Sequence, residues 1–167
     1  MLIVFLRIIH IVTGVFWAGT LFFLVSYLGP TFKEVGPDGA KVFAELRRRK
    51  LFERVPMIAG LTILSGLWMF ALRAQGGSWA QGREARMLGT GAVSAIIALY
   101  FGVFVMRKNT LGAADLMREV GPMPAGADKD AKMALVQAMR GRATMGGRAA
   151  ATLLLITVIM MAIAKYV

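Results

Sequence analysis

Residues 2–28 read LIVFLRIIHIVTGVFWAGTLFFLVSYL, an apolar stretch interrupted only by Arg7 and His10. A bilayer core about 30 Å thick requires roughly 20 apolar residues in a helix that rises about 1.5 Å per residue. The stretch is longer than the apolar core of a signal peptide and has no basic leader. We therefore expect it to be a retained helix that spans a membrane.

Three further segments approach the length of a span, at about 55–72, 87–106 and 149–164. Hydrophobic residues make up 57% of the 167 residues and charged residues 17%, with a mean hydropathy of +0.65, which excludes a disordered chain and disfavours a soluble domain. The pattern predicts an all-α fold, a four-helix transmembrane bundle that forms a single domain over 1–167. Pro56 is expected in the first turn of the second span, where its missing N–H has no intrahelical partner.

The basic residues predict the orientation of the chain. Fifteen of the twenty Lys and Arg residues fall in the stretches 29–54 and 107–148, which connect the spans on one side. By the positive-inside bias, these two loops are cytoplasmic and both termini face outward. We expect a multi-pass protein of the inner membrane that has the lipid bilayer as its surroundings.

The two basic loops carry apolar residues at near-helical spacing in 40–54 and 128–140, so we expect helical cytoplasmic extensions of the second and fourth spans. Their Lys and Arg side chains would reach anionic lipid headgroups. A dedicated lipid or nucleic-acid site is the alternative at these loops, although basic residues placed between apolar runs do not predict nucleic acid as a partner of the chain. A Gly- and Pro-rich linker over 121–126 divides the second loop.

His10 is the single histidine of the chain and lies within the first span. Ionisable residues inside a span usually face the bundle interior and mark functional sites. Arg7 precedes His10 by three positions on the same helical face, and Gly14 and Trp17 continue that face. Counting inward from the outer ends of the other spans places small or polar residues in the same layer. These are Ser65, Gly66, Ser94 or Ala95, and Thr157.

Two hypotheses follow for His10. It binds haem b as an axial ligand, with Arg7 as the partner of a propionate and with Trp17, Gly14, Ser65, Gly66 and Ala95 lining the slot. Alternatively, His10 only hydrogen-bonds Ser65, Ser94 or Thr157 and ties helices together in an accessory or scaffold subunit. Copper binding or a proton relay is a third interpretation.

The second axial ligand of such a haem is left open by the sequence. Met69, Met160 and Met161 lie in the outer halves of their spans and carry thioethers that bind metal. A second copy of His10 in a homodimer, or a five-coordinate iron, are the alternatives. The stripe Gly91, Ala95, Ala98 and Gly102 predicts close packing within the chain rather than a dimer face.

Several kinds of chemistry are excluded by the residues. The chain has no cysteine and therefore no disulfide, thiolate nucleophile, iron–sulfur cluster or Cys-ligated zinc. It has no Gly-rich phosphate loop, nucleophile elbow, HExxH motif or paired carboxylates. Whether the protein is an enzyme stays open.

The stretch from Arg7 through His10, Gly14 and Trp17 to Phe22 resembles the first span of small membrane proteins related to CopD, the copper-resistance D family, and of HemJ-type protoporphyrinogen oxidases. The likeness continues from Phe43 to Phe70. It implies a helical membrane bundle in which the first-helix histidine is associated with haem or metal, a role that passes to His10 alone.

Two departures from these families bear on the reaction. Where HemJ-like proteins have a lysine at the start of the third span, this chain has Arg86 followed by Met87, and arginine does not replace lysine as an acid, base or ligand. The outer loop over 73–86 has neither His nor Met, which copper transport would require. Haem b binding in an electron-transfer or redox role is therefore the leading expectation, ahead of copper or other metal transport.

Overall fold

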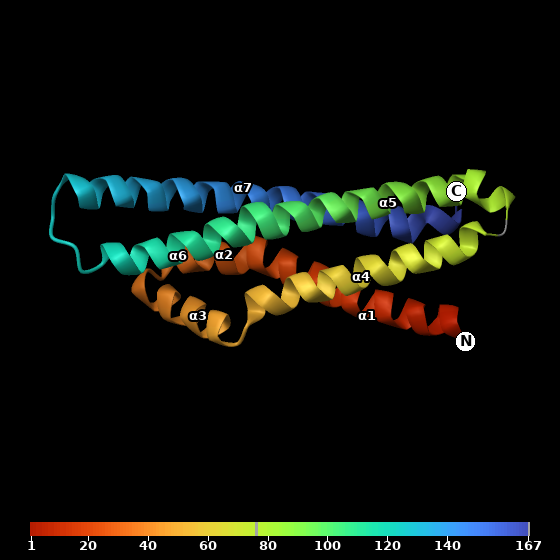
Figure 1. Ribbon diagram of the computed structural model, residues 1–167, viewed down its shortest axis with the longest axis horizontal. Helices are drawn as coiled ribbons and strands as arrows, with labels where there is room; N and C mark the ends of the chain where they lie inside the picture. Colours follow the sequence, from red (N-terminus) through yellow and green to blue (C-terminus); the bar gives the residue numbers. More distant parts are fainter. Residues whose placement is uncertain (76, 167) are drawn as a thin grey trace.

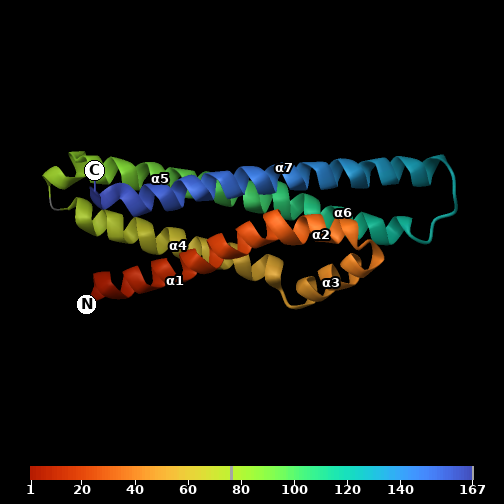
Figure 2. The ribbon, with the colours of Figure 1, turned by 180° about the vertical axis from the view of Figure 1, so that it is seen from behind.

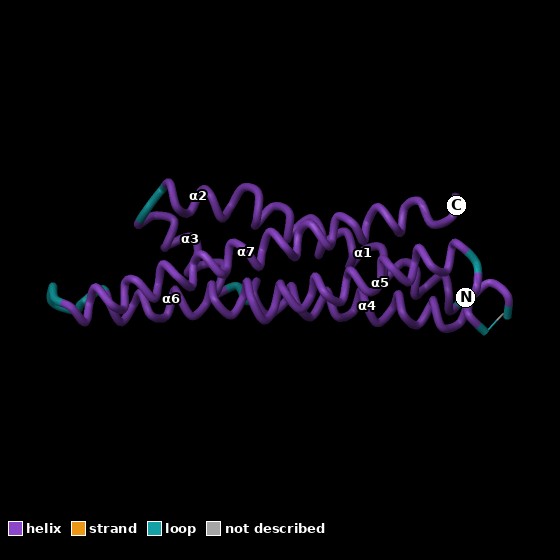
Figure 3. Tube along the Cα trace, turned by 90° about the horizontal axis from the view of Figure 1, so that it is seen from above, coloured by secondary structure: helices purple, strands orange, loops and turns teal. Residues whose placement is uncertain are grey.

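Apolar runs this long satisfy their backbone hydrogen bonds internally only as helices, and helices are what the chain forms. The computed structural model describes residues 1–75 and 77–166, without the side chain of Pro37. No strand is present in these two ranges, and the loops lie at the ends of the long helices and on either side of α3 (Figure 3). The elements are α1 (Leu2–Phe23), η1 (Leu24–Leu28), α2 (Gly29–Glu34), α3 (Pro37–Arg48), α4 (Leu51–Ala74), η2 (Ser78–Gln81), α5 (Arg83–Tyr100), η3 (Phe101–Arg107), α6 (Lys108–Val120), α7 (Ala127–Ile163) and η4 (Ala164–Tyr166).

Four continuous helices have the length and composition of membrane spans, which confirms the all-α bundle. They run over Leu2–Glu34, Leu51–Ala74, Arg83–Val120 and Ala127–Tyr166. The start of α1 and the end of α7 lie at one end of the bundle, and the α6–α7 connection lies at the other (Figures 1 and 2). The predicted arrangement, with both termini at one end and the two basic connections at the other, is confirmed by this layout.

The helices form two close pairs, because α1 packs mainly on α4 and α5 mainly on α7. Small residues make the second pair possible. A Cβ added at Gly91 would lie 3.3 Å from Cβ of Met160 and 3.5 Å from the Thr157 carbonyl oxygen. Ala95 and Ala98 are buried in the central core, as the prediction of packing within the chain requires. The core consists of Trp17, Leu21, Ala59, Ala95, Ala98, Ala150 and Leu154.

Two of the long helices extend well beyond a bilayer. The helix Arg83–Val120 has 38 residues and so measures about 57 Å, nearly twice the roughly 30 Å of a bilayer core. Its last part, α6, packs along the first half of α7 to make a protruding hairpin (Figure 1). The expected helix over 128–140 is confirmed as part of α7. The α6 helix extends the third span, which the sequence analysis did not predict, and the linker at 121–126 is the turn of the hairpin.

The expected extension of the second span over 40–54 is wrong in one respect. The helix α3 ends at Arg48, and Lys50 has a left-handed backbone with φ of 59°, so the chain turns before α4 begins at Leu51. The aromatic rings of Phe43 and Phe52, whose centroids are 5.1 Å apart, hold α3 against α4. Thus α3 is a separate helix folded back beside the bundle.

The position expected for Pro56 is also wrong. Because α4 begins at Leu51, Pro56 lies in the helix interior, and its missing N–H leaves the Phe52 carbonyl without an intrahelical donor. Nε of Arg107 donates to that carbonyl oxygen at 2.7 Å. A residue at the end of the third span thus completes the backbone hydrogen bonding of the second.

Both π-helical segments meet the same point of α7. A Cβ at Gly146 would lie 2.6 Å from Cγ1 of Val105 in η3, and one at Gly147 would lie 3.2 Å from Cγ2 of Val25 in η1. The adjacent glycines therefore let two helices approach the α7 backbone at one level. The π-helix is rare and is often found at functional sites.

Candidate functional site around His10

His10 lies at the interface between α1 and α4, where its Nδ1 is 2.7 Å from the carbonyl oxygen of Thr62. A backbone carbonyl only accepts hydrogen bonds, so Nδ1 carries a proton and donates it. In the neutral ring, Nε2 therefore holds the free lone pair. A hydrogen bond from one ring nitrogen to a carbonyl is the usual arrangement around a histidine that binds a metal through its other nitrogen.

The imidazole is held in place by the small residues of α4. A Cβ added at Gly66 would lie 2.6 Å from Cε1 and 2.9 Å from Nδ1 of His10, so only glycine leaves room for the ring. The Ser65 hydroxyl is 3.5 Å from Nδ1, a long contact, and Ser65 Oγ is also 2.8 Å from the Leu61 carbonyl oxygen. The predicted neighbours Ser65 and Gly66 do lie beside His10.

Hydroxyl groups continue this interface toward the middle of the span. The hydroxyls of Thr13 and Thr62 are 2.8 Å apart, and a Cβ at Gly14 would lie 3.4 Å from the Thr62 methyl group. Thr62 was not singled out from the sequence, because its backbone carbonyl rather than its side chain binds His10. Thr13 lies three positions after His10, and that spacing alone places it on the same face of α1.

The other nitrogen of the ring is accessible from outside the helix pair. Nε2 of His10 makes no hydrogen bond within the described residues. Every fully buried side-chain nitrogen or oxygen in those residues has a hydrogen-bond partner, so Nε2 is not one of the fully buried atoms. Nε2 is therefore not sealed in the interior, and the residue as a whole is only half-buried. The ring presents an unprotonated nitrogen that can bind a metal, accept a hydrogen bond or take up a proton.

Arg7 lies one turn from His10, nearer the N-terminus. Its side chain is exposed and makes neither an ion pair nor a hydrogen bond with any described residue. A spacing of one turn means that Arg7 and His10 share one face of α1, and the Arg7 guanidinium has no partner among the described residues.

The predicted hydrogen bonds from His10 to Ser94 or Thr157 are wrong, because both residues belong to the other helix pair. Ser94 Oγ donates to the Leu153 carbonyl at 2.7 Å. Thr157 Oγ1 is 3.1 Å from the carbonyl oxygen of Gly91. Hydroxyl–carbonyl bonds thus join α5 to α7, as the imidazole joins α1 to α4.

The remaining predicted residues are distributed over the bundle. Trp17 and Ala95 lie in the central core of the bundle. Met160 and Met161 pack against Gly91 between α5 and α7, and Met69 is partly buried on α4, one turn beyond Ser65. Within the described ranges, no group of three or more His, Asp or Glu residues gathers to hold a metal ion. A metal at His10 would therefore bring most of its ligands with it, as the iron of haem does.

Comparison of the chain with family models, with curated proteins and with solved structures finds no match.

Proposed function

We propose that this protein binds haem b in the membrane through Nε2 of His10, in an electron-transfer or redox role. The observation that carries the proposal is the hydrogen bond from Nδ1 of His10 to the Thr62 carbonyl, which leaves Nε2 as the ligating nitrogen. The porphyrin supplies four of the iron ligands, so the protein needs to supply only one, a single histidine, to bind the group. Bound haem b would carry one electron.

The surroundings of His10 suit such a ring. Arg7 supplies the cation for a propionate, and the exposed side chains of Ile11 and Val15 continue the apolar surface of α1. Since Nε2 is not fully buried and has no partner among the described residues, we propose that the porphyrin binds beside the α1–α4 pair. In a homodimer, His10 of the second copy would supply a further ligand to the same group.

We further propose that the chain lies in the inner membrane with both termini outward. The support is the placement of fifteen of the twenty basic residues in the connections at the α6–α7 end. In this orientation His10 is in the outer leaflet, while α3 and the α6–α7 hairpin are cytoplasmic.

A scaffold or accessory subunit is the second candidate, and one observation favours it. The same bond to Thr62 ties α1 to α4 without any cofactor, so His10 has a structural use of its own. The two candidates differ only in whether Nε2 is used.

Substitution of His10 by Asn separates these candidates. The Asn amide keeps a donor near the position of Nδ1, while it removes the imidazole nitrogen that binds iron. We would record oxidised and dithionite-reduced absorption spectra of the detergent-purified parent, of His10→Asn and of the control Ser94→Ala, each expressed with haem supplied.

The haem proposal predicts a Soret band and a reduced α-band in the parent and in Ser94→Ala, both lost in a folded His10→Asn. A colourless, folded parent purified from haem-replete cells would refute it and leave the scaffold subunit ahead. Bands that persist in His10→Asn would show that haem binds elsewhere in the chain.

A further inference from the structure

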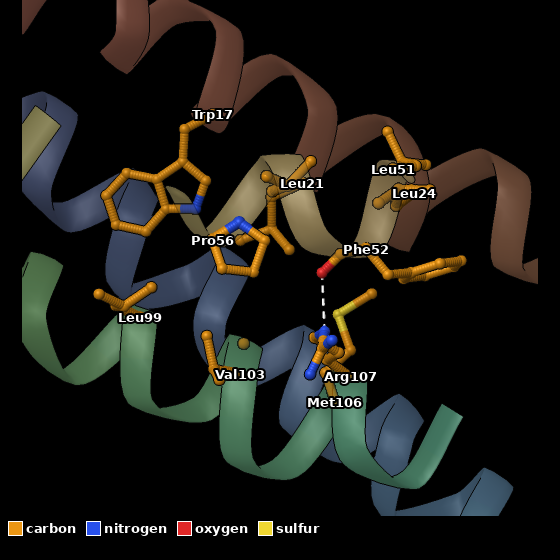
Figure 4. A pocket seen from close by; sticks show the side chains of 12 residues that line it. Trp17, Leu21, Leu24, Leu51, Phe52, Pro56, Leu99, Val103, Met106 and Arg107 are labelled. Carbon is orange, nitrogen blue, oxygen red and sulfur yellow. Dashed lines mark hydrogen bonds between the residues drawn. The ribbon is translucent and has the colours of Figure 1, made fainter. Parts of the chain in front are cut away.

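A second candidate site lies in the half of the bundle away from the termini, where a small pocket opens between α1, α4 and the α5–η3 helix (Figure 4). Its volume is about 50 Å³, and nearly all of its lining is apolar. The residues that line it include Trp17, Leu24, Phe52, Gly102, Met106 and Arg107.

Arg107 is the charged residue of the pocket. Its Nε is fixed by the Phe52 carbonyl at 2.7 Å, and its Nη2 is 3.9 Å from Oε1 of Glu53, beyond hydrogen-bond distance. The two terminal amino groups of the guanidinium therefore make no hydrogen bond to the described residues. A fixed guanidinium with unused donors is suited to a phosphate.

The helices that surround the pocket depart from regular α-helix here. The π-helical segment η1 begins at Leu24, and η3 contains Gly102, Met106 and Arg107. A Cβ added at Gly102 would meet no atom within 4 Å, so the backbone there borders open space. Pro56, which also lines the pocket, is the residue that leaves the Phe52 carbonyl to Arg107. The irregular backbone thus leaves the space open at Gly102 and provides the free Phe52 carbonyl that fixes the Arg107 guanidinium.

The size of the pocket selects among apolar ligands. A cavity of roughly 150 Å³ holds one benzene molecule, so a space of about 50 Å³ does not enclose even one six-membered ring. An alkyl chain is narrow enough to enter. The neighbouring basic residues favour an anionic headgroup. Lys50, Arg54 and Lys108 are exposed, unpaired within the described residues, and each adjacent in sequence to a residue that lines the pocket.

We propose that the pocket holds part of one acyl chain of an anionic phospholipid, whose phosphate is bound by Arg107. This inference is independent of haem binding, because it uses neither His10 nor Arg7. It assigns to one position the attraction for anionic lipid that the composition of the basic loops predicts only in general.

Trp17 lines the pocket and is 4% exposed, so its fluorescence reports contact with the acyl chain of a bound lipid. We would reconstitute the protein in phosphatidylcholine vesicles that contain a rising fraction of phosphatidylglycerol brominated on its acyl chains. The difference in fluorescence quenching between the parent and Trp17→Phe isolates the contribution of Trp17. Brominated phosphatidylcholine is the matched lipid control. A parallel measurement, native mass spectrometry of the parent with both lipids, requires no variant.

Two variants test the pocket and the charge separately. Gly102→Leu adds a side chain to the pocket from a position in η3 whose Cβ would meet no atom within 4 Å, whereas Gly89→Leu adds the same side chain at an equally open position of α5. Arg107→Gln removes the charge at the pocket, and Arg86→Gln removes an exposed charge at the other end of the same helix.

We expect half-maximal quenching of Trp17 at about a fivefold lower fraction of the anionic lipid than of phosphatidylcholine, because one basic residue at a membrane surface gives an effect of this size. Gly102→Leu should abolish the quenching, and Arg107→Gln should abolish the preference, with both controls unchanged. Equal quenching by the two lipids, or equal effects of Gly102→Leu and Gly89→Leu, would overturn the proposal. So would a parent that retains neither lipid preferentially in the mass spectrum.

Discussion

Nε of Arg107 donates to the carbonyl oxygen of Phe52 at 2.7 Å, and Pro56 is the reason that this carbonyl needs a donor. In a regular helix the N–H of residue 56 would bind it. The bond therefore connects the end of η3 to the start of α4 through a defect in the backbone of α4.

We expect Arg107→Ala to destabilise the protein by about 1.5–3 kcal/mol, the usual contribution of a hydrogen bond from a charged group. In a Pro56→Ala background the loss should fall by about 1 kcal/mol or more, since the restored N–H binds the Phe52 carbonyl. Equilibrium unfolding in detergent of the parent, the two single variants and the double variant measures this coupling. Additive losses would show that Arg107 stabilises the fold through other contacts.

The close contact at Gly146 gives a second prediction. Gly146→Ala places a methyl group 2.6 Å from Cγ1 of Val105, and we expect a loss of about 1–3 kcal/mol from overpacking. Gly141→Ala adds the same group to the same helix with no atom within 4 Å and should be stabilising by about 0.5–1 kcal/mol. Thermal unfolding compares the two. Val105→Ala should relieve only part of the loss, because Cβ of Val105 at 2.8 Å and the backbone nitrogen of Met106 at 3.0 Å remain. A Gly146→Ala protein as stable as Gly141→Ala would contradict overpacking at this contact.

The hydrogen bond to Thr62 predicts the tautomer of His10. As the chain has one histidine, the side-chain ¹⁵N spectrum of the purified protein reports this ring alone. We expect the neutral ring to carry its proton on Nδ1 and to leave Nε2 unprotonated. Gly66→Ala should disturb this pattern because its methyl group would overlap the ring, whereas Gly60→Ala, which has no atom within 4 Å of the added Cβ, should leave it unchanged.

Glu45 provides a prediction of pH dependence. Hydrogen bonds from Arg48 and Arg49 lower the pKa of its carboxyl group from 4.5 to about 2. Because the folded pKa is depressed, the stabilising contribution of the carboxylate is complete above about pH 4.5 and is lost as the pH falls toward 2. Carboxyl ¹³C titration should give a midpoint near 2. Arg48→Ala should raise the midpoint, and Lys41→Ala, which removes a partner of Asp38, should not.

The orientation is tested by reporter fusions. A reporter at the C-terminus should behave as periplasmic, and one inserted in the 121–126 turn should behave as cytoplasmic, because the basic residues gather at the turn end. The reverse result would place His10 in the inner leaflet and the Arg107 pocket in the outer one. The lipid prediction would then concern the outer leaflet.

The sequence predicts the features that are set within a single helix, and it predicts less well the contacts between helices that are far apart in the chain. The four spans follow from the apolar runs because a helix in lipid satisfies its own backbone, and the placement of both termini at one end follows from their number. The predicted stripe of Gly91, Ala95, Ala98 and Gly102 is confirmed as a close contact within the chain at its first three residues. It is wrong at Gly102, where an added Cβ would meet no atom within 4 Å.

The pairing of the helices was decided by tertiary structure. Ser94 and Thr157 lie at about the same distance from the outer ends of their spans as Ser65. Because α5 pairs with α7, however, their hydroxyls bind backbone carbonyls of that pair and not His10. Depth along a span is a property of one helix, whereas contact depends on which helix lies beside it. The acceptor for His10 is a backbone carbonyl, a group present in every residue, and no sequence pattern marks it.

The same distinction applies to the Arg107 pocket. The sequence by itself determined only that residue 56 has no backbone N–H to donate. The fold decided that α4 begins at Leu51, which leaves the Phe52 carbonyl without an intrahelical donor. Only the fold brought Arg107, 55 positions away, to that carbonyl. The physical reason is that an unpaired backbone group in an apolar environment requires a partner but does not specify one. The partner is whichever donor the packing of the helices places within reach.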